Sequence, residues 1–248
     1  MFSIRIAAVA FVAGVFVHGT AAKAEEKPGI DQPNQLKRGE AEAGWKLLFD
    51  GKTTNGWRAF RGKEIPDVWK VVDGALVCSP KNGKHGGDIV TENKYGNIEL
   101  SFEWKVTPGA NSGVMYRVSE DEDEPWKTGP EYQVLDNSRH PDGRKPKTTA
   151  ASCYALYAPE KAVTKPVGEW NQGKIVMNGN HIEHWLNGRK VVEYEVGSPD
   201  WNERFSKSKF RIYSKFAKEV TGHVDLQFHG DEVAFRNIKV RELGTVKK

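Results

Sequence analysis

The chain of 248 residues is poor in sulfur, with only two cysteines and three methionines. It has no strong excess of charge, because 37 basic residues face 33 acidic ones, and so it predicts no basic surface for nucleic acid. It also lacks the periodicity of an amphipathic helix of about 10–12 residues. The patterns G-x-S-x-G, H-E-x-x-H and the phosphate loop are absent as well. These absences argue against helical bundles, elbow-type serine hydrolases, zinc proteases and P-loop enzymes.

The first residues resemble an export signal. Arg5 precedes an apolar run over residues 6–17, and Ala22-Lys23-Ala24 fits a small-x-small cleavage site. A membrane anchor is the alternative, but the run is shorter than the ~20 apolar residues that span a bilayer. The sequence therefore predicts a signal peptide over 1–24, periplasmic or secreted protein after cleavage near Ala24, and no membrane span. Residues 25–43 are polar and predict a flexible leader, and residues 44–245 predict a single domain.

The two cysteines, Cys78 and Cys153, leave two interpretations open. Export would permit a disulfide between them. Cysteine is also a common small buried side chain. The sequence alone does not show whether the two residues meet.

Turn signals and alternating strands dominate the rest of the chain. Asn178-Gly179, Asn187-Gly188 and Asp73-Gly74 each predict a type I′ hairpin turn. They delimit a meander over 174–178, 181–186 and 189–195, and a hairpin over 68–72 and 75–79. Period-two alternation predicts further strands over 95–106, 112–119, 130–137, 209–215, 223–230 and 233–243. The fold class expected is all-β, an antiparallel sandwich or jelly roll.

No metal site is predicted. His181 and His184 lie three residues apart, which places them on opposite faces of a strand. The acidic run over 120–124 could bind Ca²⁺, although such a run is more often a solvated loop. Eight tryptophans are present, most of them expected in the core, and Trp126 and Trp201 in charged loops are candidates for the rim of a sugar site.

Polar residues recur on one face of several expected strands. Should these faces line one concavity, the residues there would supply a cation, a carboxylate and imidazoles, which are the groups that proton transfer needs. The alternative is that they are solvated or paired for structural reasons. The set is Arg117, Glu131, Gln133, His184, Gln227 and His229, with Asp136 and His140 just beyond the strand that carries Gln133.

Several motifs resemble one known family, the 3-keto-disaccharide hydrolase domain family. They are GWKLLFDGKTTNGWR (44–58), NSGVMYR (111–117), GPEYQVLDN (129–137), EWNQGKIVMNGNHIEHWLNGRKVVEYE (169–195) and LQFHGDEVAFRNIKVREL (226–243). The resemblance covers nearly all of residues 44–243. It implies a jelly roll of the concanavalin A-like lectin/glucanase type and activity on glycosides oxidised to a ketone at C3.

The chemistry implied is removal of the acidified C2 proton, expulsion of the C1 substituent and addition of water. It would explain why the paired carboxylates of a laminarinase-like glucanase are not evident on one strand. We expect His184 or His229 to transfer the proton, with Glu131 as partner. Arg117, Gln133, Gln227, Asp136, His140 and Trp126 are expected to bind an oligosaccharide or glycoside substrate.

No cofactor is predicted, although a divalent metal could replace the cation. Two other functions stay open, a noncatalytic carbohydrate-binding module and a conventional glycosidase. The oligomeric state is not predicted.

Overall fold

The structure is a computed structural model that describes Met1, residues 32–80 and residues 86–244. The expected signal peptide and the first part of the leader therefore lie outside the described residues. No helix among the described residues is long and apolar enough to cross a membrane. The domain consists of two antiparallel sheets, and nearly all of its regular structure is strand.

The larger sheet has eight strands in the order β11-β10-β9-β6-β13-β4-β3, with β1 paired to β13. Its strands are β1 (Trp45–Leu47), β3 (Trp69–Val72), β4 (Ala75–Cys78), β6 (Ile98–Val106), β9 (Asn171–Asn178), β10 (His181–Leu186), β11 (Arg189–Glu195) and β13 (Val233–Glu242). The expected three-strand meander forms one edge of this sheet, and the expected hairpin over 68–79 forms the other.

The smaller sheet has five strands in the order β2-β5-β12-β7-β8. Its strands are β2 (Trp57–Ala59), β5 (Ile89–Thr91), β7 (Asn111–Val118), β8 (Glu131–Leu135) and β12 (His223–Leu226). Every pairing in it is antiparallel. Apart from β7 and β8, neighbouring strands in this sheet are not consecutive in the sequence, as is typical of a jelly roll.

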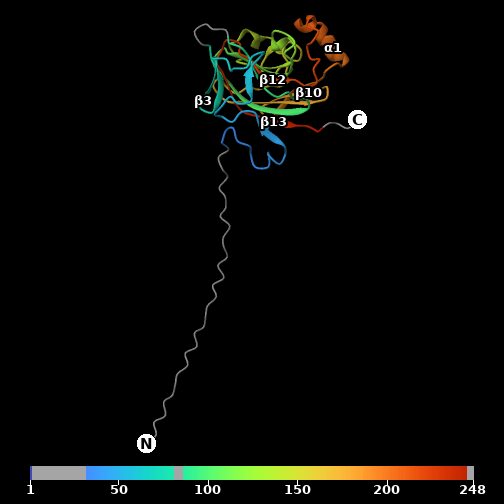
Figure 1. The fold of residues 1–248 in the computed structure, drawn as a ribbon. Coiled ribbons are helices and arrows are strands. Elements are labelled where there is room, and N and C mark those ends of the chain that lie inside the picture. The colour runs from blue at the N-terminus through green and yellow to red at the C-terminus, as the bar shows by residue number, and fades with distance from the viewer. Residues whose placement is uncertain (2–31, 81–85, 245–248) are drawn as a thin grey trace. The chain divides into compact units, whose positions relative to one another are not determined.

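The core lies between the two sheets. Tyr132 of the small sheet packs edge-on against Phe102 of the large sheet, with ring centroids 5.3 Å apart. Figure 1 shows β12 in one layer and β10 and β13 in the other. The fold is thus the expected antiparallel jelly-roll sandwich of the concanavalin A-like type.

Two of the three predicted turns have the expected geometry. Asp73-Gly74 and Asn187-Gly188 both have positive φ at each central residue, as type I′ turns demand. The third is shifted, because Asn178 pairs with His181 and the loop is therefore Gly179-Asn180. Only Gly179 has positive φ there, at 61°. A glycine at the first central position is the requirement of a type II′ turn.

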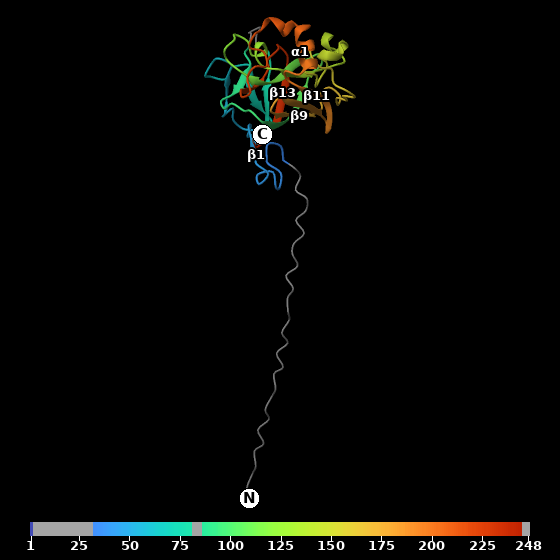
Figure 2. The same cartoon turned by 90° about the vertical axis from the view of Figure 1, so that its right-hand side faces the viewer.

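The expected strand over 209–215 is wrong. The 3-10 helix η4 (Lys209–Ile212) begins there, and the side chain of Ser208 accepts a hydrogen bond from the backbone N–H of Phe210. This segment follows α1 (Pro199–Ser206), whose buried Trp201 stacks on Tyr194 at 5.1 Å. Helix α1 lies at the periphery of the sandwich (Figures 1 and 2). The other 3-10 helices are η1 (Pro125–Lys127), η2 (Pro141–Arg144) and η3 (Pro146–Thr148).

The structure corrects one further expectation, the flexible leader, and decides another, the state of the two cysteines. The described part of the leader is anchored to the domain, because the Asn34 side chain donates to the Gly74 carbonyl and accepts from the Asn237 N–H. Cys78 and Cys153 are both free and buried, so the interpretation as small buried side chains holds.

Candidate functional site

The outer face of the small sheet carries an unusual row of polar side chains. Strand register places Asp225 beside Met115, and Met115 beside Glu131. Alternate residues on the same strands, such as Val224, Leu226 and Tyr132, are buried in the core. Because successive side chains in a strand point to opposite faces, Asp225 and Glu131 lie together on the face that turns away from the large sheet.

Glu131 is 7% exposed and lies over Gly113 of the neighbouring strand. A Cβ placed on Gly113 would come within 2.4 Å of the Glu131 Oε1 atom, so a side chain at position 113 would displace this carboxyl group. Burial raises the pKa of Glu131 to about 8, against the opposing effect of the Lys209 ammonium. The nearby carboxyl groups of Asp88 and Asp142 raise this pKa further.

Two more carboxyl groups complete what we term the carboxyl cluster, formed by Asp88, Glu131 and Asp225. Asp225 is fully buried, and neither of its carboxyl oxygens has a hydrogen-bond partner. Burial, then the charges of Asp88 and Glu131, raise the pKa of Asp225 well above its ordinary value. Burial also raises the pKa of Asp88 to about 7, although its Oδ1 accepts a 2.7 Å hydrogen bond from the Phe228 N–H.

The side chain of Lys209 lies near the carboxyl cluster. Lys209, the first residue of η4, interacts electrostatically with Glu131 and Asp142, and burial lowers its pKa. Its Nζ lies 4.5 Å from the ring centroid of Tyr154 and 5.4 Å from that of Trp126. Lys209 thus lies between the Trp126 ring and the Glu131 carboxyl group.

Two amides lie next to the carboxyl cluster. The backbone N–H of Gln227 donates to the Gly113 carbonyl, and Gly113 is the register partner of Gln133. The Gln133 Nε2 atom is buried without a hydrogen-bond partner. The structure thus places Glu131 and Gln133 on one face of β8, with Gln227 directly after β12 and Trp126 beside Lys209.

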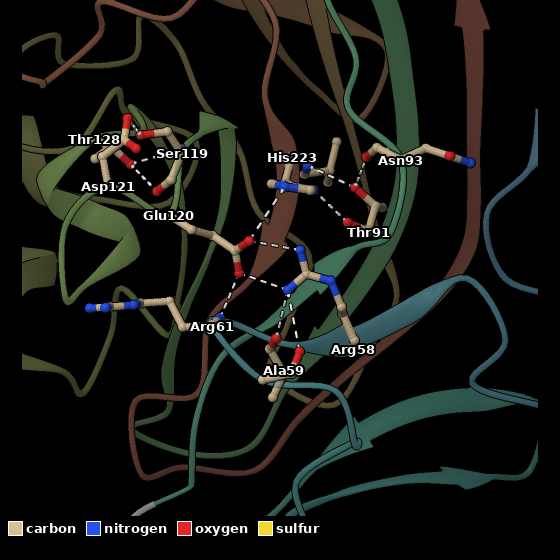
Figure 3. A network of polar contacts seen from close by, with 12 residues as sticks. Arg58, Ala59, Arg61, Thr91, Asn93, Ser119, Glu120, Asp121, Thr128 and His223 are labelled. Atoms are coloured by element: carbon tan, nitrogen blue, oxygen red, sulfur yellow. Dashed lines mark hydrogen bonds and ion pairs between the residues drawn. The ribbon is translucent and has the colours of Figure 1, made fainter.

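Glu120 differs from the carboxyl cluster, because its carboxylate is paired with an arginine. Glu120 receives two hydrogen bonds from the Arg58 guanidinium, at 2.7 and 2.8 Å, and a third from the Arg61 N–H (Figure 3). The Arg58 hydrogen bonds are the main reason that the pKa of Glu120 falls to about 2. The Nε2 atom of His223 lies 3.9 Å from Glu120. This network is satisfied and structural, unlike the carboxyl cluster. Glu120 of the acidic run therefore serves as the ion-pair partner of Arg58.

His184 is not part of the carboxyl cluster, which corrects the expectation of one shared pocket. It is fully buried between the sheets, where its Nε2 pairs with the Tyr116 hydroxyl at 2.8 Å and its Nδ1 with the Ala151 carbonyl at 3.0 Å. Burial lowers the pKa of His184 to about 4, so the ring is neutral near pH 7. His184 and Tyr132 share the core, whereas Glu131 points to the other face of β8.

The side chain of Arg117 also points away from the carboxyl cluster. It has a positive φ of 55°, and its Nη2 donates to the carbonyl of Gly179, which belongs to the β9–β10 turn of the large sheet. Burial lowers its pKa. Arg117 therefore ties the two sheets together, away from the carboxyl cluster.

The remaining expected residues lie in loops. Asp136 accepts hydrogen bonds from the Gly109 N–H and from Ser138, which is a structural role in a turn. The Nδ1 of His140 accepts from the Asp142 N–H at the start of η2. His229 is exposed and follows β12, two residues beyond Gln227.

Three residues of the site were not foreseen. Asp225 had a signal, because it alternates with Gln227 in the expected strand over 223–230, although β12 itself ends at Leu226. Asp88 directly precedes a three-residue strand, and Lys209 lies in a segment whose alternation predicts a strand. Neither residue therefore had a sequence pattern that would place it in the site.

Comparison with known proteins gives consistent results. The chain is 36% identical over 228 residues to a 3-keto-disaccharide hydrolase of Bacteroides thetaiotaomicron, covering 81% of this chain and 79% of that protein. Two crystal structures of candidate glycosyl hydrolases from Parabacteroides distasonis are also similar. The first has a TM-score of 0.79 at 33% identity and covers 86% of this chain and all of that one. The second has a TM-score of 0.61 at 31% identity and covers 80% and 99%.

The family comparison confirms the resemblance seen in the motifs. Residues 44–241 match the model of the 3-keto-alpha-glucoside-1,2-lyase-like domain. Because this match spans most of the chain, the protein belongs to the family of the 3-keto-alpha-glucoside-1,2-lyase-like domain.

Proposed function

We propose that this protein is an exported hydrolase that cleaves glycosides carrying a ketone at C3 of the sugar. The observation that carries the proposal is the carboxyl cluster, where burial brings the pKa values of Asp88 and Glu131 to about 7 and about 8. Groups that titrate near neutral pH are suited to general acid and base catalysis. The family and its Bacteroides relative supply the sugar class.

The reaction proceeds by elimination and hydration. A base removes the C2 proton, and the electron pair moves to the C3 oxygen as an enolate. The enolate re-forms the ketone, a double bond forms between C1 and C2, and the bond from C1 to the leaving oxygen breaks as that oxygen gains a proton. Water then adds its oxygen to C1 and a proton returns to C2, which gives the free 3-keto sugar and the alcohol.

The pKa values suggest separate roles for two carboxyl groups. Asp88, with a pKa of about 7, is the base because a large fraction is ionised at neutral pH. Glu131, with a pKa of about 8, is mainly protonated there and acts as the acid at the leaving oxygen. Lys209 provides positive charge for the enolate oxygen, a form of electrostatic stabilisation.

Substrate binding falls to the amides and the aromatic ring beside the cluster. The unpaired Nε2 of Gln133 and the side chain of Gln227 bind sugar hydroxyls. Trp126 offers an apolar face to the sugar ring. His229, which is exposed after β12, remains a candidate for proton exchange with solvent.

Turnover of paired substrates tests the proposal. A 3-keto glycoside and its unoxidised parent are incubated with the wild-type protein and with Glu131→Gln, Asp88→Asn and His229→Ala. We expect turnover of the keto compound alone, and a kcat lowered by about 10²-fold or more for each residue that transfers a proton. Binding without turnover would instead support a carbohydrate-binding module.

A conventional glycosidase is the second candidate, because the structure reveals several carboxyl groups on one face where the sequence showed no pair. Turnover of the unoxidised glycoside would support it and contradict the keto-sugar proposal. Export is inferred from the signal-like first 24 residues. Intact-mass measurement of the exported protein should give a chain that begins at Glu25, and retention of residues 1–24 would contradict it.

A further inference from the structure

A second cluster of titratable groups lies on the large sheet, away from the carboxyl cluster. His181 and Glu183 are two residues apart on β10 and so share a face, and Glu193 of β11 is the register partner of Glu183. One ligand atom from each of these three residues lies within 4.8 Å of the other two. We term them the β10–β11 triad. Among the described residues, they form the one such group of three.

The distances within the triad suit a tetrahedral ion. The His181 Nε2 atom lies 3.4 Å from Glu183 Oε1 and 3.3 Å from Glu193 Oε1. A zinc ion with bonds of about 2.0–2.1 Å to nitrogen and oxygen separates its ligand atoms by about 3.3–3.5 Å. The ligand oxygens of Glu183 and Glu193 lie within 4.8 Å of each other, so an ion can enter between the three ligand atoms once the Lys190 ammonium group moves away.

Neighbouring side chains also contact two of the proposed ligands. The second oxygen of Glu183 accepts a 2.7 Å hydrogen bond from the Trp185 indole N–H, which leaves Oε1 free to face His181. The other ring nitrogen of His181, Nδ1, lies 3.9 Å from Glu195 Oε2. In known metal sites a carboxylate beside the second ring nitrogen orients a ligating histidine. All four residues lie on β10 and β11, and the pairing of these strands fixes the spacing of their backbones.

A lysine holds the position that a cation would take. The Lys190 Nζ atom lies 3.1 Å from Glu183 Oε1 and 2.7 Å from Glu193 Oε2. It offsets only part of the charge of Glu183, Glu193 and Glu195. Lys190 is exposed and its side chain is flexible, so a divalent ion can displace its ammonium group into solvent.

The geometry points to a zinc site formed by His181 Nε2, Glu183 and Glu193, with Glu195 orienting the histidine and Lys190 competing with the metal. One nitrogen and two carboxylate ligands suit Zn²⁺ better than Ca²⁺, which takes six to eight oxygen ligands. The bound ion would join β11, the edge strand of the large sheet, to β10. It would thus stabilise the edge of the sandwich without touching the proposed reaction.

Calorimetric titration of the untagged full chain with zinc chloride tests the site. We expect one zinc ion per chain that depends on the triad, and a higher melting temperature with zinc because the metal binds the folded state. His181→Ala should abolish this binding and the rise in melting temperature. Glu195→Gln should weaken binding by about 10-fold, as loss of an orienting carboxylate does.

Lys190→Met gives the sharpest comparison, because it removes the competing cation and leaves the three ligands. Its zinc affinity should rise by roughly 3–10-fold, the equivalent of one or two surface ion pairs. His140→Ala is the matched control, since His140 is only partly buried and lies beside Asp142 outside the triad. It should bind zinc as the wild type does.

Two outcomes would overturn the site. One is a wild-type chain that binds no zinc, and the other is a His181→Ala variant that binds zinc like the wild type. Calcium chloride in the same titration should give no binding, and calcium affinity equal to that for zinc would equally contradict a nitrogen-containing site.

Discussion

At the scale of single residues, the environment of each acid decides its role. Glu120 and Glu131 are the same chemical group, yet one has a pKa of about 2 and the other of about 8. The first is paired with Arg58, and the second is buried against other carboxyl groups. Strand alternation located Glu131, Gln133 and Gln227 because it reports which face a side chain occupies. It could not report which face looks outward, which is why His184 was wrongly placed with them.

The position of His184 leads to a prediction about stability. The ring bridges the buried Tyr116 hydroxyl and the Ala151 carbonyl. His184→Ala would leave the Ala151 carbonyl unpaired, at about 1–3 kcal/mol, and would leave a cavity in the core, while the Tyr116 hydroxyl would keep the Tyr194 hydroxyl as its partner. We expect the free energy of unfolding to fall by about 2–5 kcal/mol in urea denaturation. Tyr116→Phe, which removes only the hydroxyl, should cost less.

A loss below about 0.5 kcal/mol in His184→Ala would contradict the bridging role. The folded fraction of the variant should keep most of its turnover on a 3-keto glycoside, because His184 does not reach the carboxyl cluster. A large fall in kcat with unchanged stability would restore the original expectation that this histidine transfers a proton.

At the scale of elements, local turn chemistry was the most reliable part of the sequence. The meander and the β3–β4 hairpin follow from Asn-Gly and Asp-Gly pairs, whose φ requirements are local. The segment over 209–215 failed because its alternation competes with a hydrogen bond from the Phe210 N–H to the Ser208 side chain, which begins a 3-10 turn. That turn supplies Lys209 to the site, so the error in the fold hid a residue of the site.

The turn between β10 and β11 can be tested alone. Gly188 has a φ of 81°, and a Cβ there would meet nothing within 4 Å. Gly188→Ala should therefore cost only the strain of the left-handed conformation, about 1–2 kcal/mol of unfolding free energy. Gly87→Ala is the control, because Gly87 lacks a positive φ and its nearest contact is ordinary, at 3.9 Å from the Pro66 side chain. Equal costs for the two variants in urea denaturation would show that backbone strain is not the cause.

At the scale of the whole molecule, the carboxyl cluster depends on long-range pairing of strands, which the sequence did not reveal. Asp88, Glu131 and Asp225 come from strands β8 and β12 and from the residue before β5, which are far apart in the chain. Their proximity depends on the order β2-β5-β12-β7-β8. No local pattern encodes that order, so the carboxyl cluster appears only once the sandwich is assembled.

The carboxyl cluster should make the stability of the protein depend on pH. The folded pKa values of Glu131 and Asp88, about 8 and about 7, lie above their ordinary values of 4.5 and 3.8. Between the ordinary and the folded pKa values the folded state therefore binds more protons, and the stability this confers is lost as pH rises from about 4 to about 8. Below about pH 6.5 the lowered pKa of His184 has the opposite effect, since that ring charges more readily in the unfolded chain. His184 offsets only one of the two carboxyl groups there, so stability already falls slowly below pH 6.5, and the steepest part of the fall should lie between pH 6.5 and 8.5.

Melting temperatures measured across that range check the sign. Glu131 alone should account for about 2 kcal/mol, which corresponds to a decrease of roughly 4–8 °C in a protein of this size. Glu131→Gln cannot lose a proton, so its melting temperature should fall less over the same interval. Glu120→Gln is the matched control, because the pKa of Glu120 is about 2 and the group stays ionised throughout the range. Its melting temperature should be lower at every pH but fall with the wild-type slope. A wild-type melting temperature that rises from pH 6.5 to 8.5 would mean that the cluster is ionised in the folded state, and the assignment of Glu131 as the acid would fail with it.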